Sequence, residues 1–511
     1  GDWIGQVSWS QAAGARTQYH WRSTLTAADL HALGMPAGLE PKAPLPVDVS
    51  MTSAGGGFSG SALIAGGAFR FSASPAAKGR RRMTINGALD GKTLADLGLG
   101  PQGMISGPTG LNAVVDLAGD GLRGGHVQID LQRAALSAPF VAWKKPAGRP
   151  MQIDADFVRK DGGVEASDVK GSGPGFALSA SGAWKSGAGG VLHASDFRLE
   201  GAFDGSIDLG FDDSGVRLAS RARYFDARRL LQQPERGAAA TAGGGHSGAA
   251  DKGFHVDAQL AQVRVSDTGM IHNVRIEGQV SPADQRRLDV SVGREDGAEL
   301  VSLQLYPDAG GMAVNGQVSD VGEAAFVMFG RHSFQGGKAV VTGRLVEGGA
   351  DLRVDMSKVR LVKAPALARI LTIGSLHGMA DTLNGAGIEF TKVVAPVSVR
   401  GAKLTIGRAR ATGPAMGITT QGVIDIDNRT VDLSGGIAPS YILNSAVGAV
   451  PVVGQLLVSH KGEGMFGLTY SARGAFASPK ITVNPLSLAA PGILRRIFEG
   501  HSQVAHADPA G

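Results

Sequence analysis

The sequence predicts a mainly β fold, an elongated and curled antiparallel sheet that forms a groove, with only short capping helices. Apolar residues occur in short runs that alternate with polar residues, and Gly, Asp, Asn and Ser interrupt these runs almost everywhere. This is the pattern of many short strands joined by tight turns. The 511 residues include 77 glycines but only 5% aromatic residues, fewer large side chains than a compact core of this size would use. We therefore expect a thin or open interior.

The first part of the chain, residues 1–84, is predicted to be the end of an upstream β unit. Two strands are expected at Trp3–Trp9 and Gln18–Thr24, followed by a short helix over 26–36 that begins with a capping box. A similar helix is expected over 93–101. Because the chain opens on Gly1 without an initiator Met, we expect a further N-terminal part to precede it.

Residues 85–236 are predicted to form a domain of repeated strands. Because successive side chains of a strand point to opposite faces of the sheet, alternation of apolar and polar residues predicts one apolar face. The alternating runs are Ile85–Leu89, Asn112–Leu117, His126–Leu131, Met151–Phe157 and Phe176–Ser181.

The second half of the chain continues this organisation. Residues 237–253 have no hydrophobic periodicity, which predicts a disordered loop, and a further ladder of strands is expected over 254–363. Short helices are predicted over 224–231 and 320–330. A longer helix near 366–383 has apolar residues at close to helical spacing, and is expected either to lie against the sheet or to act as a movable gate.

Two predicted strands near the C-terminus allow a test of register. Even-numbered apolar residues of 416–426 share one face. Pairing Ile426 with Val431 across the following turn would place Ile424 opposite Leu433, so that the apolar residues of both strands lie together.

The preceding strand has the same kind of apolar face. Leu404 and Ile406 belong to it, and a bulge is expected near Gly407 because arginines follow in the same phase. The residues predicted to line the groove are Leu404, Ile406, Met416, Ile418, Ile424, Ile426, Val431 and Leu433.

The end of the chain is predicted to be a strand, a proline break and a short helix over 491–498, followed by a disordered tail over 499–511. The helix either docks on a membrane through its amphipathic surface or covers the end of the sheet. Its candidate docking residues are Ile493, Leu494, Arg495, Arg496, Ile497 and Phe498.

Several classes of function are disfavoured. The net charge of +5 is scattered, without an arginine-rich block among aromatic residues, so no nucleic acid is expected as a partner. The absence of cysteine excludes thiol catalysis, disulfides and cysteine-bound metal, and the histidines show no metal-site spacing. Carboxylates are dispersed, without a recognisable acid–base pair. We expect no enzyme activity, no metal and no cofactor.

Four segments of the last third carry a family resemblance. They are the helical segment from Ala368 to Leu383, the strand pair around Gly413, the sequence from Pro439 to Ser445, and the ending that starts at Val483. In this order they resemble the C-terminal region of the AsmA-like family of bacterial envelope proteins, the group of AsmA, TamB and YhdP. This region would cover 364–498. Residues 85–207 resemble, more loosely, the domain of unknown function that precedes it in that family.

The resemblance implies a function. The chain would be the periplasmic part of a bridge-like lipid transfer protein, tethered to the inner membrane through a preceding N-terminal segment. It would passively shield phospholipid acyl chains in an apolar β groove between the inner and outer membranes. Its partners would be phospholipids, one or both membranes, and envelope proteins.

Two other functions are considered. A non-enzymatic scaffold or regulator of outer-membrane assembly would act by binding proteins, and its inward faces should be filled by side chains and helices. A β-helical carbohydrate enzyme would need clustered acidic and aromatic residues, which an aromatic content of 5% disfavours.

Overall fold

The chain divides into two compact units, Gly1–Gln285 and Arg286–Gly511. The computed structural model describes side chains from residue 57 on. It describes residues 3–10, 18–26, 46–54, 57–64, 67–74, 80–92, 104–118, 121–138, 141, 143–185, 188–232, 253–267, 269–280, 286–309, 311–330, 332–374, 376–439, 468–476 and 478–484.

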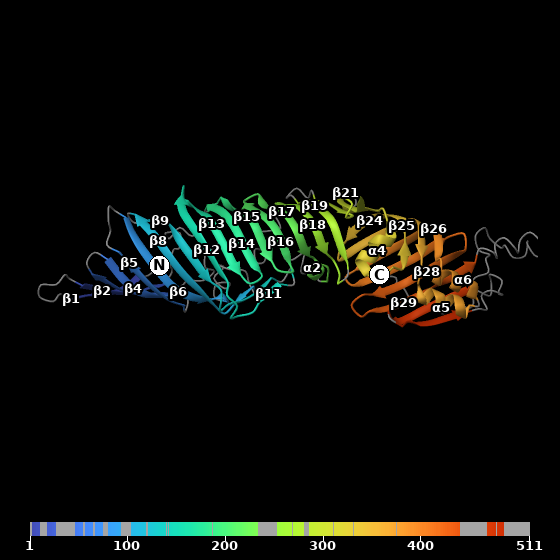
Figure 1. The fold of residues 1–511 in the computed structure, drawn as a ribbon, viewed down its shortest axis with the longest axis horizontal. Coiled ribbons are helices and arrows are strands. Elements are labelled where there is room, and N and C mark those ends of the chain that lie inside the picture. The colour runs from blue at the N-terminus through green and yellow to red at the C-terminus, as the bar shows by residue number, and fades with distance from the viewer. Residues whose placement is uncertain are drawn as a thin grey trace, which may run out of the picture. The chain divides into compact units, whose positions relative to one another are not determined.

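The first unit is a ladder in which each strand pairs with the preceding one, antiparallel except at one pair (Figure 1). Its strands are β1 (Trp3–Ser10), β2 (Gln18–Thr26), β3 (Pro46–Ala54), β4 (Gly57–Ile64), β5 (Gly67–Ala73), β6 (Arg80–Asp90), β8 (Pro108–Ala118), β9 (Gly121–Asp130), β12 (Gln152–Lys160), β13 (Gly163–Gly173), β14 (Phe176–Lys185), β15 (Gly189–Leu199), β16 (Phe203–Asp212), β17 (Gly215–Asp226), β18 (Gly253–Arg264) and β19 (Met270–Val280).

Three short strands form a separate small sheet in this unit: β7 (Ile105–Ser106), β10 (Ala135–Ala138) and β11 (Trp143–Lys145). The short helix α2 (Arg228–Gln232) follows β17. β18 then pairs with β17 in parallel, with Gly215 opposite Gly253 and Asp226 opposite Arg264.

The second unit is an antiparallel ladder with three helices. Its strands are β20 (Arg286–Gly293), β21 (Glu299–Asp308), β22 (Gly311–Val318), β23 (Phe334–Gln335), β24 (Lys338–Val346), β25 (Gly349–Leu361), β26 (Ile388–Arg400), β27 (Lys403–Thr412), β28 (Met416–Asp425), β29 (Thr430–Pro439), β30 (Leu468–Ala475) and β31 (Lys480–Asn484). Its described helices are α4 (Val321–Phe329), α5 (Pro365–Ile373) and α6 (His377–Asn384).

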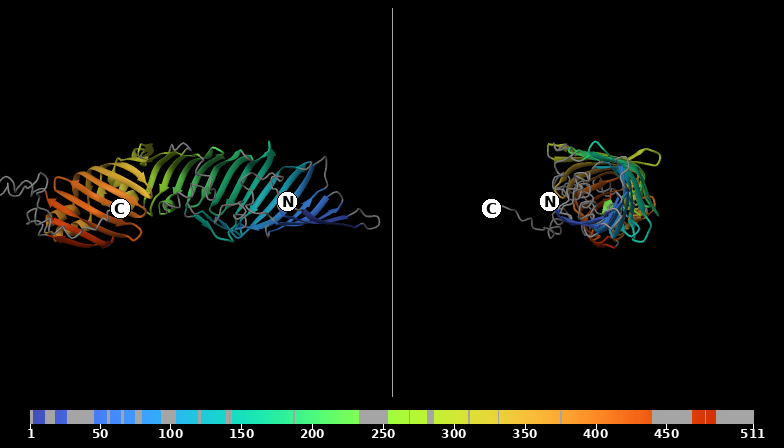
Figure 2. Two further views of the ribbon diagram at one scale, coloured as in Figure 1. Left: turned by 180° about the vertical axis from the view of Figure 1, so that it is seen from behind. Right: turned by 90° about the vertical axis from the view of Figure 1, so that its left-hand side faces the viewer.

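These observations confirm the predicted fold class. The described residues are mainly in strands, the sheet of each unit is curled and unclosed, and the described helices are short (Figure 2). The five alternating runs lie in β6, β8, β9, β12 and β14. No helix among the described residues has the length and apolarity needed to cross a membrane.

The helix predicted over 320–330 is confirmed as α4. The side chain of Asp320 accepts a hydrogen bond from the backbone N–H of Glu323, and Gly330 ends the helix in the left-handed conformation. These are the features expected of a helix N-cap and C-cap.

The prediction of a single longer helix near 366–383 is wrong, because the segment forms two helices, α5 and α6. Helix α5 ends at Gly374, whose N–H donates to the carbonyl of Ile370, and the N–H of Leu376 donates to the carbonyl of Leu371. A Cβ atom at position 374 would lie 2.2 Å from Cδ1 of Leu468. Glycine therefore allows Leu468 to pack directly against the break.

Several predictions fall outside the described residues. They are the helix over 26–36 after its first residue, the helix over 93–101, most of the loop 237–253, the C-terminal helix over 491–498 and the tail. Within the described chain, Thr26 is the last residue of β2, and Gly253 is the first of β18.

Candidate functional site: the apolar inner face

One face of the second unit is apolar across every strand of its ladder except the two-residue β23. Residues directly opposite each other on neighbouring strands share a face, so the register can be followed from strand to strand. One such register row contains no polar residue: Leu288, Leu305, Val314, Gly343, Leu352, Val397, Ile406, Gly422, Leu433, Ala472 and Ile481. We call the face that carries this row the inner face.

The first unit has an equivalent inner face. From β4 to β19 a register row again contains only apolar residues and glycine: Phe58, Ala73, Met83, Val115, Gly125, Phe157, Ala166, Gly182, Leu192, Leu209, Leu218, Val256 and Gly278. The parallel pair β17–β18 does not interrupt the row.

The opposite, outer face carries many charged side chains in both units. Arg223 donates from Nε to Asp204 across 3.0 Å, and on β25 Arg353 donates from Nε to Asp355 across 2.7 Å. Exposed pairs of this kind contribute little free energy to folding. Their position shows which side of each sheet faces water.

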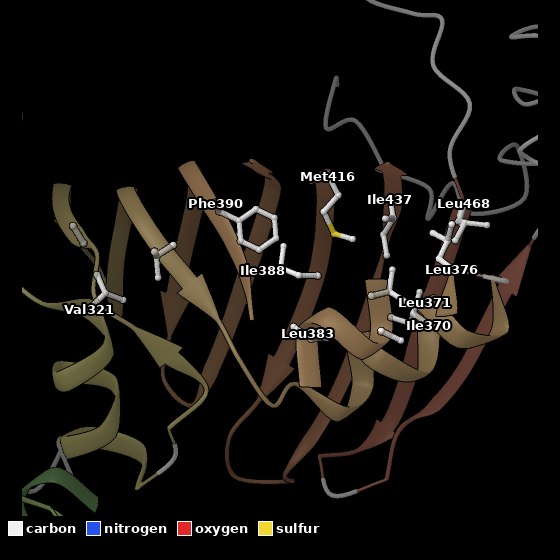
Figure 3. Close-up of a cluster of buried hydrophobic side chains, with 13 residues drawn as sticks. Val321, Ile370, Leu371, Leu376, Leu383, Ile388, Phe390, Met416, Ile437 and Leu468 are labelled. Atoms are coloured by element: carbon white, nitrogen blue, oxygen red, sulfur yellow. The ribbon is translucent and has the colours of Figure 1, made fainter. Parts of the chain in front are cut away.

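Helices cover one end of the inner face in the second unit. Ile370 and Leu371 of α5 and Leu383 of α6 pack against the ends of β26, β28, β29 and β30 (Figure 3). The strand residues in this cluster include Ile388, Phe390, Met416, Ile437 and Leu468, of which none is more than 3% exposed. This end is therefore a packed core.

The other end of the same strands is different. Leu352, Val397, Leu404 and Val431 lie on the inner face, are outside the cluster beneath α5 and α6, and remain partly exposed. The inner face of the second unit is therefore filled at one strand end and partly open at the other.

The residues predicted to line the groove do not all share this position. Leu404, Ile406, Ile424, Val431 and Leu433 are on the inner face and partly exposed. Ile418 is on the same face but packs against the edge of the helix-covered core, and Met416 is fully buried in that core. Met416 therefore has no free surface to offer a ligand.

The predicted register of β28 and β29 is wrong by two residues. Ile424 lies opposite Val431, and Leu433 lies opposite Gly422. The side chain of Asp425 accepts hydrogen bonds from the backbone and side-chain nitrogens of Asn428, which fixes a turn of the predicted length one residue earlier in the chain, at 426–429. A shift of two residues keeps every side chain on its face, so the apolar residues still lie together.

The remaining groove candidate, Ile426, lies in that turn beyond the end of β28 and is 57% exposed. The bulge predicted near Gly407 is confirmed, since the register shifts between Ile406 and Ala409. The membrane-docking candidates 493–498 lie outside the described residues.

The first unit is also closed at one end of its inner face. Trp143, from the small sheet, lies 6.4 Å from Phe176 between ring centroids, and ring contacts continue through Phe197 and Phe203 to Phe225. Neither the small sheet nor this aromatic row was foreseen, because three strands of two to four residues leave no usable periodicity in the sequence.

Two buried charges hold the same end together. Lys145 is 4% exposed and donates to the carbonyl oxygen of Ala134 across 2.6 Å, and burial lowers the pKa of its amine. Asp226 is fully buried at the end of β17. Burial alone would raise the pKa of its carboxyl, but hydrogen bonds from Arg228 outweigh burial and hold that pKa below its ordinary value.

The opposite end of the first unit exposes large apolar side chains. Leu192, Phe211, Val216 and Val280 are on the inner face and between 37% and 43% exposed. Adjacent exposed apolar residues of this size mark binding surfaces more often than scattered single ones do.

The inner faces offer mainly apolar surface. Within the described part of the chain, no three His, Asp or Glu side chains are grouped to hold a metal ion. Comparisons with protein-family models, curated proteins and solved structures find no match to this chain.

Proposed function

We propose that this chain is the periplasmic part of an inner-membrane-tethered, bridge-like lipid transfer protein. Its inner faces shield phospholipid acyl chains from water on their way between the inner and outer membranes. The observation that carries the proposal is the register row of apolar residues and glycine that crosses every strand of the second unit except the two-residue β23. The matching row in the first unit supports it.

The mechanism is passive. Each methylene group removed from water gains about 0.8 kcal/mol, and an apolar row offers nearly the same gain at each strand. A chain can then move from strand to strand without crossing a polar barrier, while its headgroup stays in water. No residue acts as a catalyst, and no metal or cofactor takes part.

The location and the partners rest on the family resemblance. The AsmA-like segments imply a periplasmic protein tethered to the inner membrane, with phospholipids and envelope proteins as partners. A curled sheet that is polar outside and apolar inside suits an aqueous compartment between two membranes.

The core beneath α5 and α6 favours a second candidate, a scaffold that affects outer-membrane assembly by binding proteins. A scaffold predicts a filled interior, and this core is filled. The partly open strand ends, which carry Leu404 and Val431, favour lipid transfer instead.

Photocrosslinking in cells separates the two candidates. A benzophenone amino acid in place of Ile424 puts the probe on the inner face. The control replaces Val423, which lies on the outer face of the same strand and is 37% exposed. We expect phosphate-labelled lipid adducts at position 424 and none at 423. Protein adducts alone, or equal lipid labelling at both positions, would favour the scaffold.

A further inference from the structure

The free edge of the inner face in the first unit combines apolar and cationic side chains. The outermost register row runs from β12 to β19. Its members are Arg159, Val164, Trp184, Gly190, Phe211, Val216, Phe254 and Val280. This row lies at the strand ends opposite the small sheet and its aromatic row.

A depression of about 380 Å³ lies at this edge, where the hairpins β12–β13, β14–β15 and β16–β17 come together. Val164, Trp184 and Phe211 form its apolar wall. Its charged lining consists of the cations Lys160, Lys185 and Arg217 and the carboxylates Asp161, Glu165 and Asp212. Its volume lies in the range of small-molecule sites.

Gly190 gives the apolar wall its shape. A Cβ atom at this position would lie 2.7 Å from Cβ of Trp184 and 2.8 Å from Cζ of Phe211. Both aromatic side chains therefore approach a residue without a side chain. Phe211 is still 43% exposed, so the wall has surface to offer.

The charges at the edge are not all compensated. Arg217 pairs with Asp212, and Nζ of Lys160 lies 3.9 Å from Glu165. The side chains of Arg159 and Lys185 make no hydrogen bond or ion pair with any residue that the structure describes. Arg159 sits in the apolar row itself, next to Val164, while Lys185 approaches from the outer side of the same edge.

The apolar wall continues into the inner face, Lys185 lines the depression, and Arg159 lies opposite Val164 of the wall. Apolar surface beside two unpaired cations complements an amphiphile with an anionic head. We propose that this edge binds the phosphate of a glycerophospholipid whose acyl chains lie on the inner face, with Arg159 and Lys185 contacting the phosphate. Guanidinium and ammonium groups bind phosphate through charge-assisted hydrogen bonds. The proposal rests on the proposed lipid function and adds a recognition site for the headgroup.

The test compares two lipids with identical acyl chains, phosphatidylglycerol and diacylglycerol, each offered in vesicles to the purified protein. Bound lipid is quantified by mass spectrometry after the vesicles are removed. The variant is Arg159→Gln with Lys185→Gln. The matched control is Lys170→Gln with Arg198→Gln, which removes the same charge from the outer face of the same unit.

We expect the edge variant to bind phosphatidylglycerol roughly tenfold or more weakly and diacylglycerol unchanged, with the control like the native protein. If both lipids bind but the edge variant does not change their ratio, the headgroup site is wrong and lipid binding stands. If the native protein binds neither lipid, the proposed function fails as well. If inorganic phosphate alone binds with the same dependence on Arg159 and Lys185, the site belongs to a free anion and the proposal is overturned.

Discussion

At the scale of single residues, Asp226 shows what sequence inspection could not reveal. An aspartate at the end of a predicted strand is typical of a solvated turn, yet this side chain is fully buried. Arg228 donates from Nη2 and Nε to its two carboxylate oxygens, and its Nη1 donates to exposed Asp267 across 2.7 Å. The ion pair fixes the point where the chain leaves β17.

Asp226→Asn should destabilise the first unit at neutral pH by about 3–5 kcal/mol, because it leaves the half-buried Arg228 without its buried partner. The folded pKa of Asp226 lies below the ordinary value of 3.8. The stabilisation is therefore present above pH 3.8 and is lost as the pH falls through the lower folded value. Native protein and variant should converge in acid, as measured by urea unfolding with hydrogen exchange in β17.

Asp267→Asn is the matched control, because Asp267 contacts the same arginine but is 92% exposed. We expect it to change the free energy of unfolding by less than about 1 kcal/mol. A loss as large as that of Asp226→Asn would show that burial does not set the strength of this pair.

At the scale of elements, the sequence predicted strands and faces better than boundaries. The alternation of apolar and polar residues located β6, β8, β9, β12 and β14. This two-residue period can be recognised even where the strand register shifts slightly. The break between α5 and α6 was missed, since it depends on Leu468, 94 residues beyond Gly374 (468 − 374 = 94). The turn after β28 was placed one residue late because the hydrogen bonds from Asn428 to Asp425 were not foreseen.

Engineered cysteines can verify the register of β28 and β29, because the native chain contains none. Ile424→Cys with Val431→Cys should form a disulfide on mild oxidation, since directly opposite residues have Cα atoms within bonding range. Ile426→Cys with Val431→Cys should remain reduced, as followed by gel mobility. Preferential disulfide formation by the second pair would instead support the register predicted from the sequence.

At the scale of the whole molecule, an apolar face was predictable from alternation, but its continuity was not. Bulges in β12, β13, β26 and β27 shift the register, and only the observed pairings show that the rows continue across them. The partial cover of each face by α5, α6 and the small sheet was equally beyond sequence reasoning, because it depends on contacts between distant segments.

A charged side chain placed in the apolar register row should slow the transfer of phospholipid along the inner face. Lipid should still bind to the inner face on either side of the charge. Ile406→Asp puts a carboxylate in the middle of the row of the second unit, and Thr405→Asp puts it on the outer face one residue away. A charge facing hydrocarbon costs about 2.5–3.5 kcal/mol, so we expect transfer of labelled phospholipid between vesicles to slow roughly tenfold or more for Ile406→Asp alone. Equal rates for the two variants would contradict a continuous path.

The parallel pairing of β17 with β18 also bears on how the chain folds. Most hairpins of the ladder join neighbouring strands through a few residues and can form early, because closing a short loop costs little entropy. Every contact between β17 and β18 instead spans 38 residues (253 − 215 = 38), without a tight turn to start it. We expect the strands before this seam and those after it to assemble as separate nuclei, and their joining to be a slow step.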